Sequence, residues 1–492
     1  MAFDFNGKRV YIAPHTPRTT MFQKSFCEYY PNAECLGFID KTKEGDEIFK
    51  LDTIIETPFD AILILSQNHF SSIYDDYTVH IPKSKLIKID IIDNRYHFFD
   101  ERDISRQKYA AIPQKLRMKF LSLLTRFIDA FGFKRSKNVF IAKSFVGTNT
   151  KMLYLHTATR YTNTVLLTDN QHQLSQFKIH GFPVAPLLSL KAIWNIAWGK
   201  NLIMDQGNYT EPLKHLSPHQ KTIQMWHGIP LKRMNRLTDI TYDYLVSTSD
   251  YVNETSLSHV IVAKEYKDYG YPRNDLLLKE HSEYDLLLCD HNLYKLAKST
   301  FGTQTKVIVY MPTHREASTE LENPKTPLIP LDFNLLDHSL KILNAILIVK
   351  LHPFIMQFYQ SFAPEGGYEH IHFHSSQGDV YPILKYADIL ITDYSSVYFD
   401  FLLLNRPIIF FDYDYEEYSG NMGGFVYDYE KNAPGGKIKT QNDLIVILQS
   451  IVQDKESFAS QRTNIKDLFF AYQDMYSSER IVKNLIKSSV IL

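Results

Sequence analysis

Short apolar runs, each closed by polar residues, recur along the whole chain. Four of them fall in the first hundred residues and are predicted strands: KRVYIAP, ECLGFID, FDAILILS and KLIKIDII. Segments of helix length separate them, which is typical of a small α/β unit with a parallel sheet. We therefore predict a small Rossmann-like accessory domain over residues 1–105.

The turn after the first of these strands decides what this domain can bind. It reads Pro14-His15-Thr16-Pro17-Arg18 and lacks the G-x-G-x-x-G pattern that brings a helix N-terminus onto a dinucleotide pyrophosphate. We therefore expect a scaffold or contact role here, and no dinucleotide.

Eight further apolar runs occupy the rest of the chain. KNVFIAK, TNTVLLTD, KNLIMDQ and TIQMWHG predict one α/β domain over residues 138–285, while VIVYMPTHR, AILIVKLHP, DILITDYSS and PIIFFDYD predict a second over residues 286–492. Polar residues follow each strand directly. Because open α/β sheets bind ligands at the carboxyl ends of their strands, we expect these residues to line one crevice.

A helical pattern with a basic surround spans residues 106–137, between the accessory domain and the rest. Its apolar positions recur at helical spacing: Leu116, Phe120, Leu123, Leu124, Phe127 and Phe131. Seven lysines and arginines accompany them between residues 115 and 137, against the single acid Asp129. Such a helix either lies on an anionic membrane or packs its apolar stripe against a neighbouring domain.

Composition narrows the classes of partner. The 492 residues are 44% hydrophobic and 22% charged, with a formal net charge of -1, so a broad electrostatic footprint for nucleic acid is not indicated. Three cysteines without a Cys-x-x-Cys pair fit a reducing compartment. With no signal peptide and no membrane-spanning run in the sequence, we expect a cytoplasmic protein, with contact at the cytoplasmic face of the inner membrane as the open alternative.

The stretch ILITDYSSVYFDFLLLNRPIIFF predicts a strand over residues 389–392, a helix over 397–404 and a second strand over 408–411. The turn before the helix holds Asp393, Ser395 and Ser396. Unpaired N–H groups at a helix start favour an anion, and two hydroxyls add donors for a phosphate. The alternative is an ordinary serine N-cap.

Cationic and imidazole groups follow other predicted strands. His227 and Gly228 stand in MWHGIPLK, with Lys232 close behind. Thr313 and Arg315 close YMPTHRE, and His352 precedes a proline in VKLHPF. An imidazole can transfer protons near neutral pH, and a guanidinium can bind phosphate with two hydrogen bonds. Each also has a structural alternative, as a core or capping histidine or as a surface ion pair.

Two other patterns carry weaker signals. In EHIHFHSS, the three histidines His370, His372 and His374 share one strand face and could bind zinc, or they could simply alternate on a polar surface. The acids Asp412, Asp414, Glu416 and Glu417 could reach a nucleoside, or they could form a solvated loop.

The motifs WHGIPLKRM, YMPTHRE, VKLHPF, ADILITDYSSVYFDFLLLNRPIIFFDYDYEEY and GGFVYDYEKNAPGG occur in an order that closely resembles the CDP-glycerol glycerophosphotransferases of bacterial teichoic-acid and capsule synthesis. The resemblance covers about residues 138–480. It implies a GT-B-type pair of Rossmann-like domains facing a cleft, an acceptor domain followed by a nucleotide-donor domain with a closing helix. It also implies a CDP-polyol donor and release of CMP.

The resemblance, read with the residues, gives each group a role. His227, His352 and Arg315 are the expected catalytic residues, with His227 as general base. The expected donor and phosphate ligands are Ser395, Ser396, Asp393, Gly228, Lys232 and Thr313. We expect no metal and no cofactor other than the donor substrate CDP-glycerol, and a polymer or lipid-linked acceptor.

Two other functions remain open from the sequence. Bacterial sialyl- and polysialyltransferases also combine a His-Pro motif with paired serines to hold CMP, so a glycosyltransferase that uses a CMP-sugar is the main rival. A non-catalytic scaffold of envelope assembly is the second. The choice between glycerol and ribitol, and between priming and polymerisation, is also open.

Overall fold

The computed structural model describes most of the chain. The described ranges are 4–43, 45–66, 70–92, 95–102, 104, 114–142, 147–207, 210–237, 239–313, 329–351, 367–374, 378–421 and 424–486. Two compact units form, one around the first of three β-sheets and one around the other two.

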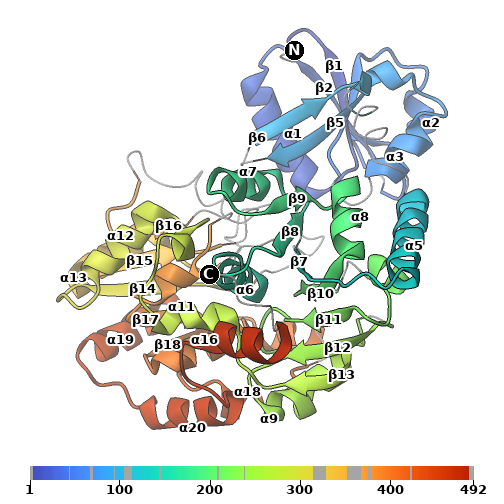
Figure 1. The fold of residues 1–492 in the computed structure, drawn as a ribbon. Helices are drawn as coiled ribbons and strands as arrows, with labels where there is room; N and C mark the ends of the chain where they lie inside the picture. The colour runs from blue at the N-terminus through green and yellow to red at the C-terminus, as the bar shows by residue number, and fades with distance from the viewer. Residues whose placement is uncertain are drawn as a thin grey trace. The chain divides into compact units, whose positions relative to one another are not determined.

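The first unit is a six-stranded sheet flanked by helices (Figure 1). Its strands in chain order are β1 (Arg9–Ala13), β2 (Glu34–Ile39), β3 (Ile48–Phe49), β4 (Ala61–Ile64), β5 (Leu86–Ile92) and β6 (Arg95–Phe99). Its helices include α1 (Pro17–Tyr29), α2 (Leu51–Ile54) and α3 (Phe70–Tyr77). The order is β3-β2-β1-β4-β5-β6, parallel except for the antiparallel edge strand β6. The apolar residues of β1 and β4 alternate between cores on the two faces of the sheet.

The turn after β1 is bonded to its own surroundings. Thr16 caps α1 by accepting from the Thr19 backbone N–H, and the side chain of Thr19 reaches back to the N–H of Thr16. The carboxylate of Asp40, at the end of β2, accepts from the backbone N–H groups of His15, Thr42 and Lys43. These bonds engage the groups that a dinucleotide would meet at the strand ends, and the scaffold role of this domain stays a prediction.

The second unit begins with a seven-stranded parallel sheet in the order β13-β12-β11-β10-β7-β8-β9. Its strands are β7 (Lys137–Ile141), β8 (Thr164–Thr168), β9 (Val184–Pro186), β10 (Gly199–Met204), β11 (Lys221–Gln224), β12 (Thr241–Val246) and β13 (Val262–Lys267). The helices around it are α5 (Gln114–Ala130), α6 (Asn149–Ala158), α7 (Gln171–Ile179), α8 (Leu190–Ala197), α9 (Asp250–Val252) and α10 (Ser258–Val260). Figure 1 shows α5 and α8 packed side by side on this domain.

A six-stranded parallel sheet builds the other half of this unit, in the order β16-β15-β14-β17-β18-β19. Its strands are β14 (Lys306–Tyr310), β15 (Ala345–Val349), β16 (Ile371–Phe373), β17 (Ile389–Thr392), β18 (Ile408–Phe411) and β19 (Gly436–Ile438). The helices of this half and of the connections to it are α11 (Asp275–Leu278), α12 (His291–Thr300), α13 (Phe333–Leu343), α15 (Tyr381–Leu384), α16 (Val397–Phe401), α17 (Tyr415–Asn421), α18 (Tyr429–Asn432), α19 (Gln441–Val452), α20 (Ala459–Phe469) and α21 (Ser477–Ile481). One hydrophobic core runs from the seven-stranded sheet onto one face of the six-stranded sheet of this second unit.

All twelve strands predicted from the apolar runs are present. The pattern missed short edge strands such as β9, β16 and β19, whose three residues carry too little periodicity. The helix predicted over 397–404 divides, because α16 ends at Phe401 and a tighter 3-10 turn covers Leu402–Leu404.

Helix α5 divides its apolar residues between two faces. Leu121 and Ile128 are buried in the core of the second unit. The stripe noted in the sequence is largely exposed: Leu116 57%, Phe120 45%, Leu123 66%, Phe127 51% and Phe131 66%. Among the helices that the structure describes, none is both long and apolar enough to cross a bilayer. The basic segment thus packs on its domain through one face and offers another to solvent.

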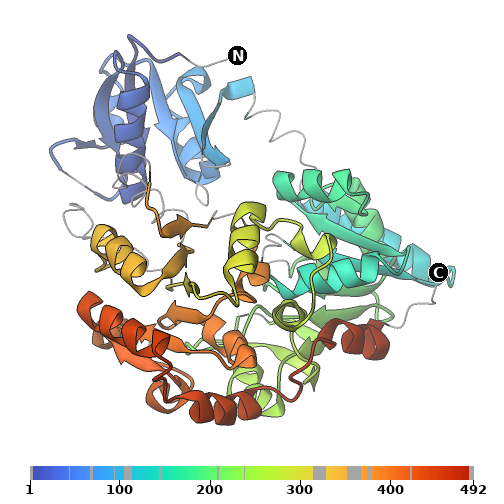
Figure 2. The same cartoon turned by 90° about the vertical axis from the view of Figure 1, so that its left-hand side faces the viewer.

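The last described residues of the chain return to the domain that contains the seven-stranded sheet. Figure 2 shows the red C-terminal segment running from the second domain back to the green one. The backbone carbonyl of Ile486 accepts from the side chain of Asn201 in β10, and Ser477 and Ser478 donate to Asp275. This closing segment therefore ties the two domains of the second unit together.

Candidate functional site

The loop after β11 presents His227 in a strained and heavily bonded turn. Trp226 lies in the left-handed region at φ 50°, and its buried ring lies against the His227 ring at a centroid distance of 4.0 Å, with the two planes tilted by 33°. The side-chain amide of Asn149 donates to the carbonyls of Met225 and Trp226 at 3.2 and 2.9 Å. These contacts fix the backbone that precedes an imidazole that reaches solvent.

One backbone contact orients the imidazole. Nδ1 of His227 lies 3.1 Å from the carbonyl oxygen of Asp205, which can only accept, so Nδ1 carries the proton and Nε2 is left to accept one. Burial lowers the pKa of His227, the charge of Arg273 lowers it further, and the bond to Asp205 opposes both. These contacts favour the neutral imidazole, and the role of His227 as a general base stays a prediction.

Asp205, at the end of β10, is fully buried behind this loop. Its carboxylate accepts from the side chain and the backbone N–H of Thr150, at the start of α6. Burial raises the pKa of Asp205 to about 6, against the lowering effect of the Thr150 and Thr148 bonds. The Asp205 carboxylate therefore binds the N-terminus of α6. The same residue supplies the backbone carbonyl that orients His227.

The serine turn after β17 has the opposite character. Ser396 stands at the N-cap of α16 with helical backbone angles, φ -62° and ψ -10°, and its side chain makes no capping bond. Within the described part of the chain, no hydrogen bond to the hydroxyl of Ser395 or Ser396 is found, although both side chains are half-buried. The ordinary N-cap alternative is therefore wrong for Ser396, and both hydroxyls can serve a ligand.

Thr313 and Asp393, which follow two neighbouring strands, are hydrogen-bonded to each other. The backbone N–H and the hydroxyl of Thr313 donate to Oδ1 of Asp393 at 2.8 and 2.6 Å. This pair joins the end of β14 to the start of the serine turn, and it positions the turn whether or not either residue touches the donor. Their role as donor ligands stays a prediction.

The His227 loop and the serine turn meet at Gly228. A Cβ on this glycine would lie 3.0 Å from Oγ of Ser396 and 2.8 Å from Nη2 of Arg273, and its φ of 141° disfavours other residues. The backbone of Lys232 forms an isolated antiparallel β-bridge with the backbone of Phe425, and the Lys232 Nζ lies 4.9 Å from the centroid of the Tyr418 ring. The structure thus brings together predicted residues from both domains. Arg315 and His352 lie outside the described residues.

Sequence reasoning missed the most highly connected side chain of this region. Arg273 is 5% exposed, donates to the carbonyl of His227 at 2.7 Å and to Oδ2 of Asp400 at 2.5 Å, and stacks on the Tyr381 ring. The available signal was GYPRND, a turn with Gly270, Pro272 and two charged residues shortly after the segment that forms β13. For Asp205 the signal was its place directly after the strand NLIM.

The metal alternative gains no support. Among the described residues, no three His, Cys, Asp or Glu side chains come close enough to hold a metal ion. His374 is fully buried and His370 and His372 are half-buried, so the surface alternation expected for these histidines is also wrong. The prediction that no metal is needed stays a prediction.

The acidic run after β18 is only partly a solvated loop. Asp412 is buried, and burial raises its pKa to about 6. Asp414 accepts from the hydroxyl of Tyr394 at 3.1 Å, which ties it to the serine turn. Glu416 pairs with Lys439 at the surface. Contact of this run with a nucleoside stays a prediction.

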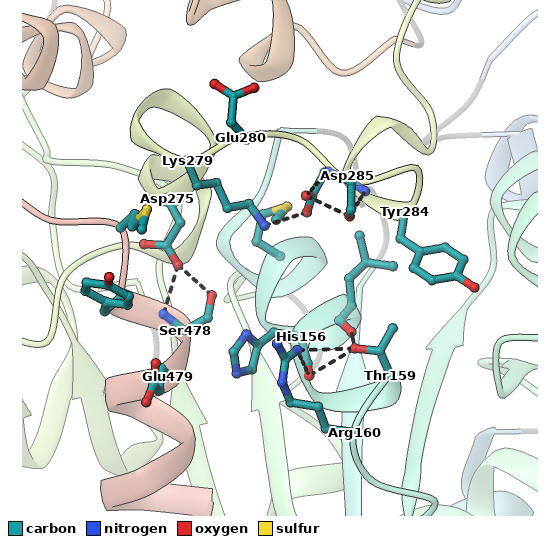
Figure 3. Close-up of a pocket in the computed structure, with 15 residues that line it drawn as sticks. His156, Thr159, Arg160, Asp275, Lys279, Glu280, Tyr284, Asp285, Ser478 and Glu479 are labelled. Carbon is teal, nitrogen blue, oxygen red and sulfur yellow. Dashed lines mark hydrogen bonds and ion pairs between the residues drawn. The ribbon is translucent and has the colours of Figure 1, made fainter.

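A separate pocket of about 420 Å³ lies where α6, the segment that contains α11 and the closing segment with α21 meet (Figure 3). Its lining mixes both signs of charge with an apolar floor: Met152, Leu155, His156, Thr159, Arg160, Asp275, Lys279, Glu280, Ser282, Tyr284, Asp285, Met475, Tyr476, Ser478 and Glu479. Burial lowers the pKa of His156 to about 4. None of the predicted site residues lines this pocket.

Comparison of the sequence with known proteins finds a matching family. The family model described as CDP-glycerol:poly(glycerophosphate) glycerophosphotransferase matches residues 124–487. The chain is 31% identical over 324 residues to a teichoic acid poly(glycerol phosphate) polymerase of Bacillus spizizenii, covering 61% of this chain and 77% of that one. It is 28% identical over 338 residues to a teichoic acid glycerol-phosphate transferase of Staphylococcus aureus, covering 63% and 82%.

A solved structure shares the fold. The wall teichoic acid polymerase TagF superposes with a TM-score of 0.57 at 22% identity, covering 78% of this chain and 95% of that chain. The predicted fold class, a GT-B-type pair of Rossmann-like domains preceded by a small α/β domain, is confirmed. Because its model matches nearly three quarters of the residues, this chain belongs to the CDP-glycerol:poly(glycerophosphate) glycerophosphotransferase family.

Proposed function

We propose that this chain transfers glycerol phosphate from CDP-glycerol to a hydroxyl of a growing cell-envelope polymer and releases CMP. The family match over residues 124–487 carries the proposal. The contact of the His227 loop with the serine turn at Gly228 supports it, because the residues proposed as base and as phosphate ligand come from two domains that meet there.

The reaction uses these groups in distinct ways. The acceptor oxygen forms a bond to the phosphorus of the glycerol phosphate group, and the bond from that phosphorus to the CMP oxygen breaks. Nε2 of His227 takes the acceptor proton, and CMP leaves with the bonding electron pair. The hydroxyls of Ser395 and Ser396 donate to the pyrophosphate and stabilise charge on the leaving group. Arg315 and His352 complete this set in the proposal.

The donor polyol is glycerol in this proposal. Names of similar proteins contain both polyols, including a teichoic acid poly(ribitol-phosphate) polymerase of Bacillus spizizenii that is 32% identical over 217 residues. At similar length the match to a glycerol phosphate polymerase is 31% identical over 324 residues, and the match to a ribitol-phosphate primase of the same organism is 25% identical over 323 residues, which favours CDP-glycerol.

The exposed face of α5 and α8 supplies a contact for membrane-bound acceptors. Beside the α5 stripe, Leu190 and Trp194 of α8 are half exposed, at 54% and 50%. Exposed lysines and an arginine lie on the same two helices and just after α5: Lys115, Lys119, Arg126, Lys134 and Lys191. Apolar side chains accompanied by cations suit the interface of an anionic membrane. We call this surface the α5–α8 face and propose that it docks peripherally on the cytoplasmic leaflet.

A donor competition tests the reaction. The purified chain is incubated with an oligo(glycerol phosphate) acceptor and CDP-glycerol, CDP-ribitol or CMP-sialic acid, and both CMP release and product mass are measured. We expect CMP release with CDP-glycerol and products that grow by whole glycerol phosphate units. Transfer from CMP-sialic acid alone would replace the proposal with a sugar transferase, and no transfer from any donor would favour a scaffold.

A further inference from the structure

Arg273 is the one described side chain that donates to both the His227 loop and the helix following the serine turn. Its Nη1 donates to the His227 carbonyl at 2.7 Å, and its Nη2 donates to Oδ2 of Asp400 at 2.5 Å. Asp400 lies in α16, one helical turn past Ser396, and also accepts from the hydroxyl of Tyr381 at 2.7 Å. One guanidinium therefore connects the two halves of the candidate site.

The geometry of this connection needs an arginine. A planar guanidinium presents donors in a fixed fork, whereas the ammonium of a lysine is a point charge that cannot span two acceptors in the same way. The bare Cα of Gly228 leaves room for the fork, since a Cβ there would lie 2.8 Å from Nη2. The separation of His227 from Ser396 thus depends on the shape of one side chain.

Stability alone does not explain the pair. Within the described chain, Nε of Arg273 and Oδ1 of Asp400 are buried without a hydrogen-bond partner. A buried ion pair that is incompletely bonded gains little over apolar residues of the same size. A role in placing neighbouring groups accounts for this buried pair better than a gain in folding free energy does.

The same short segment is anchored on its other side. Asp275 accepts from the backbone N–H groups of Ser477 and Ser478 and from the Ser478 hydroxyl, all within 3.0 Å (Figure 3). The Arg273 backbone N–H also donates to the Asn149 side chain at 3.3 Å. Arg273 is therefore held by α6 and by the closing segment, and it cannot move without disturbing both.

We propose that Arg273 is a positioning residue, which holds the general base and the donor-binding serine turn at the separation that transfer requires. The inference rests on the proposed function. A displacement of about 1 Å in a reacting group can cost roughly 10²-fold in rate. Loss of the fork should therefore reduce kcat and leave donor affinity nearly intact.

Two variants separate positioning from folding. Arg273→Lys keeps the charge but loses the fork, while Arg273→Met combined with Asp400→Asn removes both charges, so that no unpaired buried charge remains. We expect kcat to fall roughly 10²-fold in each, with the Kd for CDP-glycerol, measured by calorimetry, changed less than about threefold. Arg462→Lys is the matched control, because Arg462 is equally buried and pairs with Glu456 at 2.6 Å.

The pH profile adds a readout that a structural role would not change. The groups facing His227 are the Asp205 carbonyl, with its buried carboxylate, and Arg273, which is backed by Asp400 and Tyr381. The Arg273 charge lowers the pKa of His227, so the acid limb should move to higher pH in the double variant and stay in place in Arg273→Lys.

Three results would overturn the inference: normal kcat in Arg273→Lys, a rise in Kd as large as the fall in kcat, or an equal loss in the Arg462→Lys control. Failure of the proposed function looks different, because the unmodified protein would then release no CMP from CDP-glycerol. The comparison of variants is made only against the transfer rate of the unmodified protein.

Discussion

The His227 loop and the Ser395–Ser396 turn are both strand-end turns of parallel sheets, and they are built in opposite ways. The His227 loop is bonded by Asn149, Arg273 and the Asp205 carbonyl. The serine turn is held by its carboxylate and aromatic residues, and within the described chain its two hydroxyls have no hydrogen bond.

The difference follows from what each turn must do. A general base works only from a fixed position and in a fixed tautomer, so its neighbours use up the hydrogen bonds around it. A phosphate-binding turn must keep its donors for the ligand, so the scaffold is bonded and the donors are not. The bonded His227 loop is therefore what we expect of the proposed base, and the half-buried hydroxyls without hydrogen bonds are what we expect of the proposed phosphate ligands.

The largest effect is expected at the base. His227→Ala should reduce transfer by roughly 10²–10⁴-fold and leave CDP-glycerol affinity nearly unchanged, because the ring acts on the acceptor proton. Initial rates of CMP release and calorimetric titration measure the two quantities. His259→Ala, at an exposed histidine of α10, is the control. Near-normal turnover in His227→Ala would remove this residue from the mechanism.

Removing both serine hydroxyls should have the next largest effect. In the Ser395→Ala, Ser396→Ala variant the Kd for CDP-glycerol should rise tenfold or more, since hydrogen bonds to a charged group contribute roughly 1.5–3 kcal/mol. The Kd for CMP, which carries a single phosphate, should rise less.

A true helix cap provides the matched control for the serines. Ser189 accepts from the Ala192 N–H at the start of α8, so Ser189→Ala should lower stability by about 0.5–2 kcal/mol and leave donor binding alone. A lowered melting temperature with unchanged donor affinity in the double serine variant would make the two turns alike and contradict the comparison.

The α5–α8 face should affect only delivery of the acceptor. Changing Phe120 and Phe127 to glutamate should weaken co-sedimentation with anionic vesicles several-fold, and binding of the unmodified protein should fall as salt rises. Rates with a soluble acceptor and the donor Kd should not change. Glutamate at Ile342 and Val446, exposed apolar residues of the second domain, serves as control. Vesicle binding that ignores both salt and the α5 changes would refute the docking proposal.

The smallest expected effect concerns pH. Because desolvation and Arg273 lower the pKa of His227, the neutral ring should persist to more acidic pH than a histidine with an unperturbed pKa would allow. The acid limb of the kcat profile should therefore lie below the ordinary histidine pKa of about 6.5. The profile of the double serine variant should keep the same limb. An acid limb above about pH 6.5 would show that the pKa of His227 is not lowered by its surroundings.

The sequence predicted the strands and their terminal residues better than the links between them. Apolar runs ending in polar residues mark His227 and the serines, because this pattern is local. Arg273 and Asp205 were not predicted as site residues, because their contacts are with residues that are distant in the sequence. Asp400 is 127 positions beyond Arg273, and Thr150 is 55 positions before Asp205. The uncapped state of Ser396 also depends on backbone angles that the letters alone do not determine.

The most direct test of this division of labour is transfer measured in single turnovers at rising CDP-glycerol concentration. We expect the double serine variant to approach the rate of the unmodified protein once the donor saturates it, because its defect lies mainly in binding. His227→Ala should remain slow at every donor concentration. The proposed roles of base and phosphate ligands are contradicted if excess donor restores the transfer rate of His227→Ala, or if the serine variant stays as slow as His227→Ala at saturating donor.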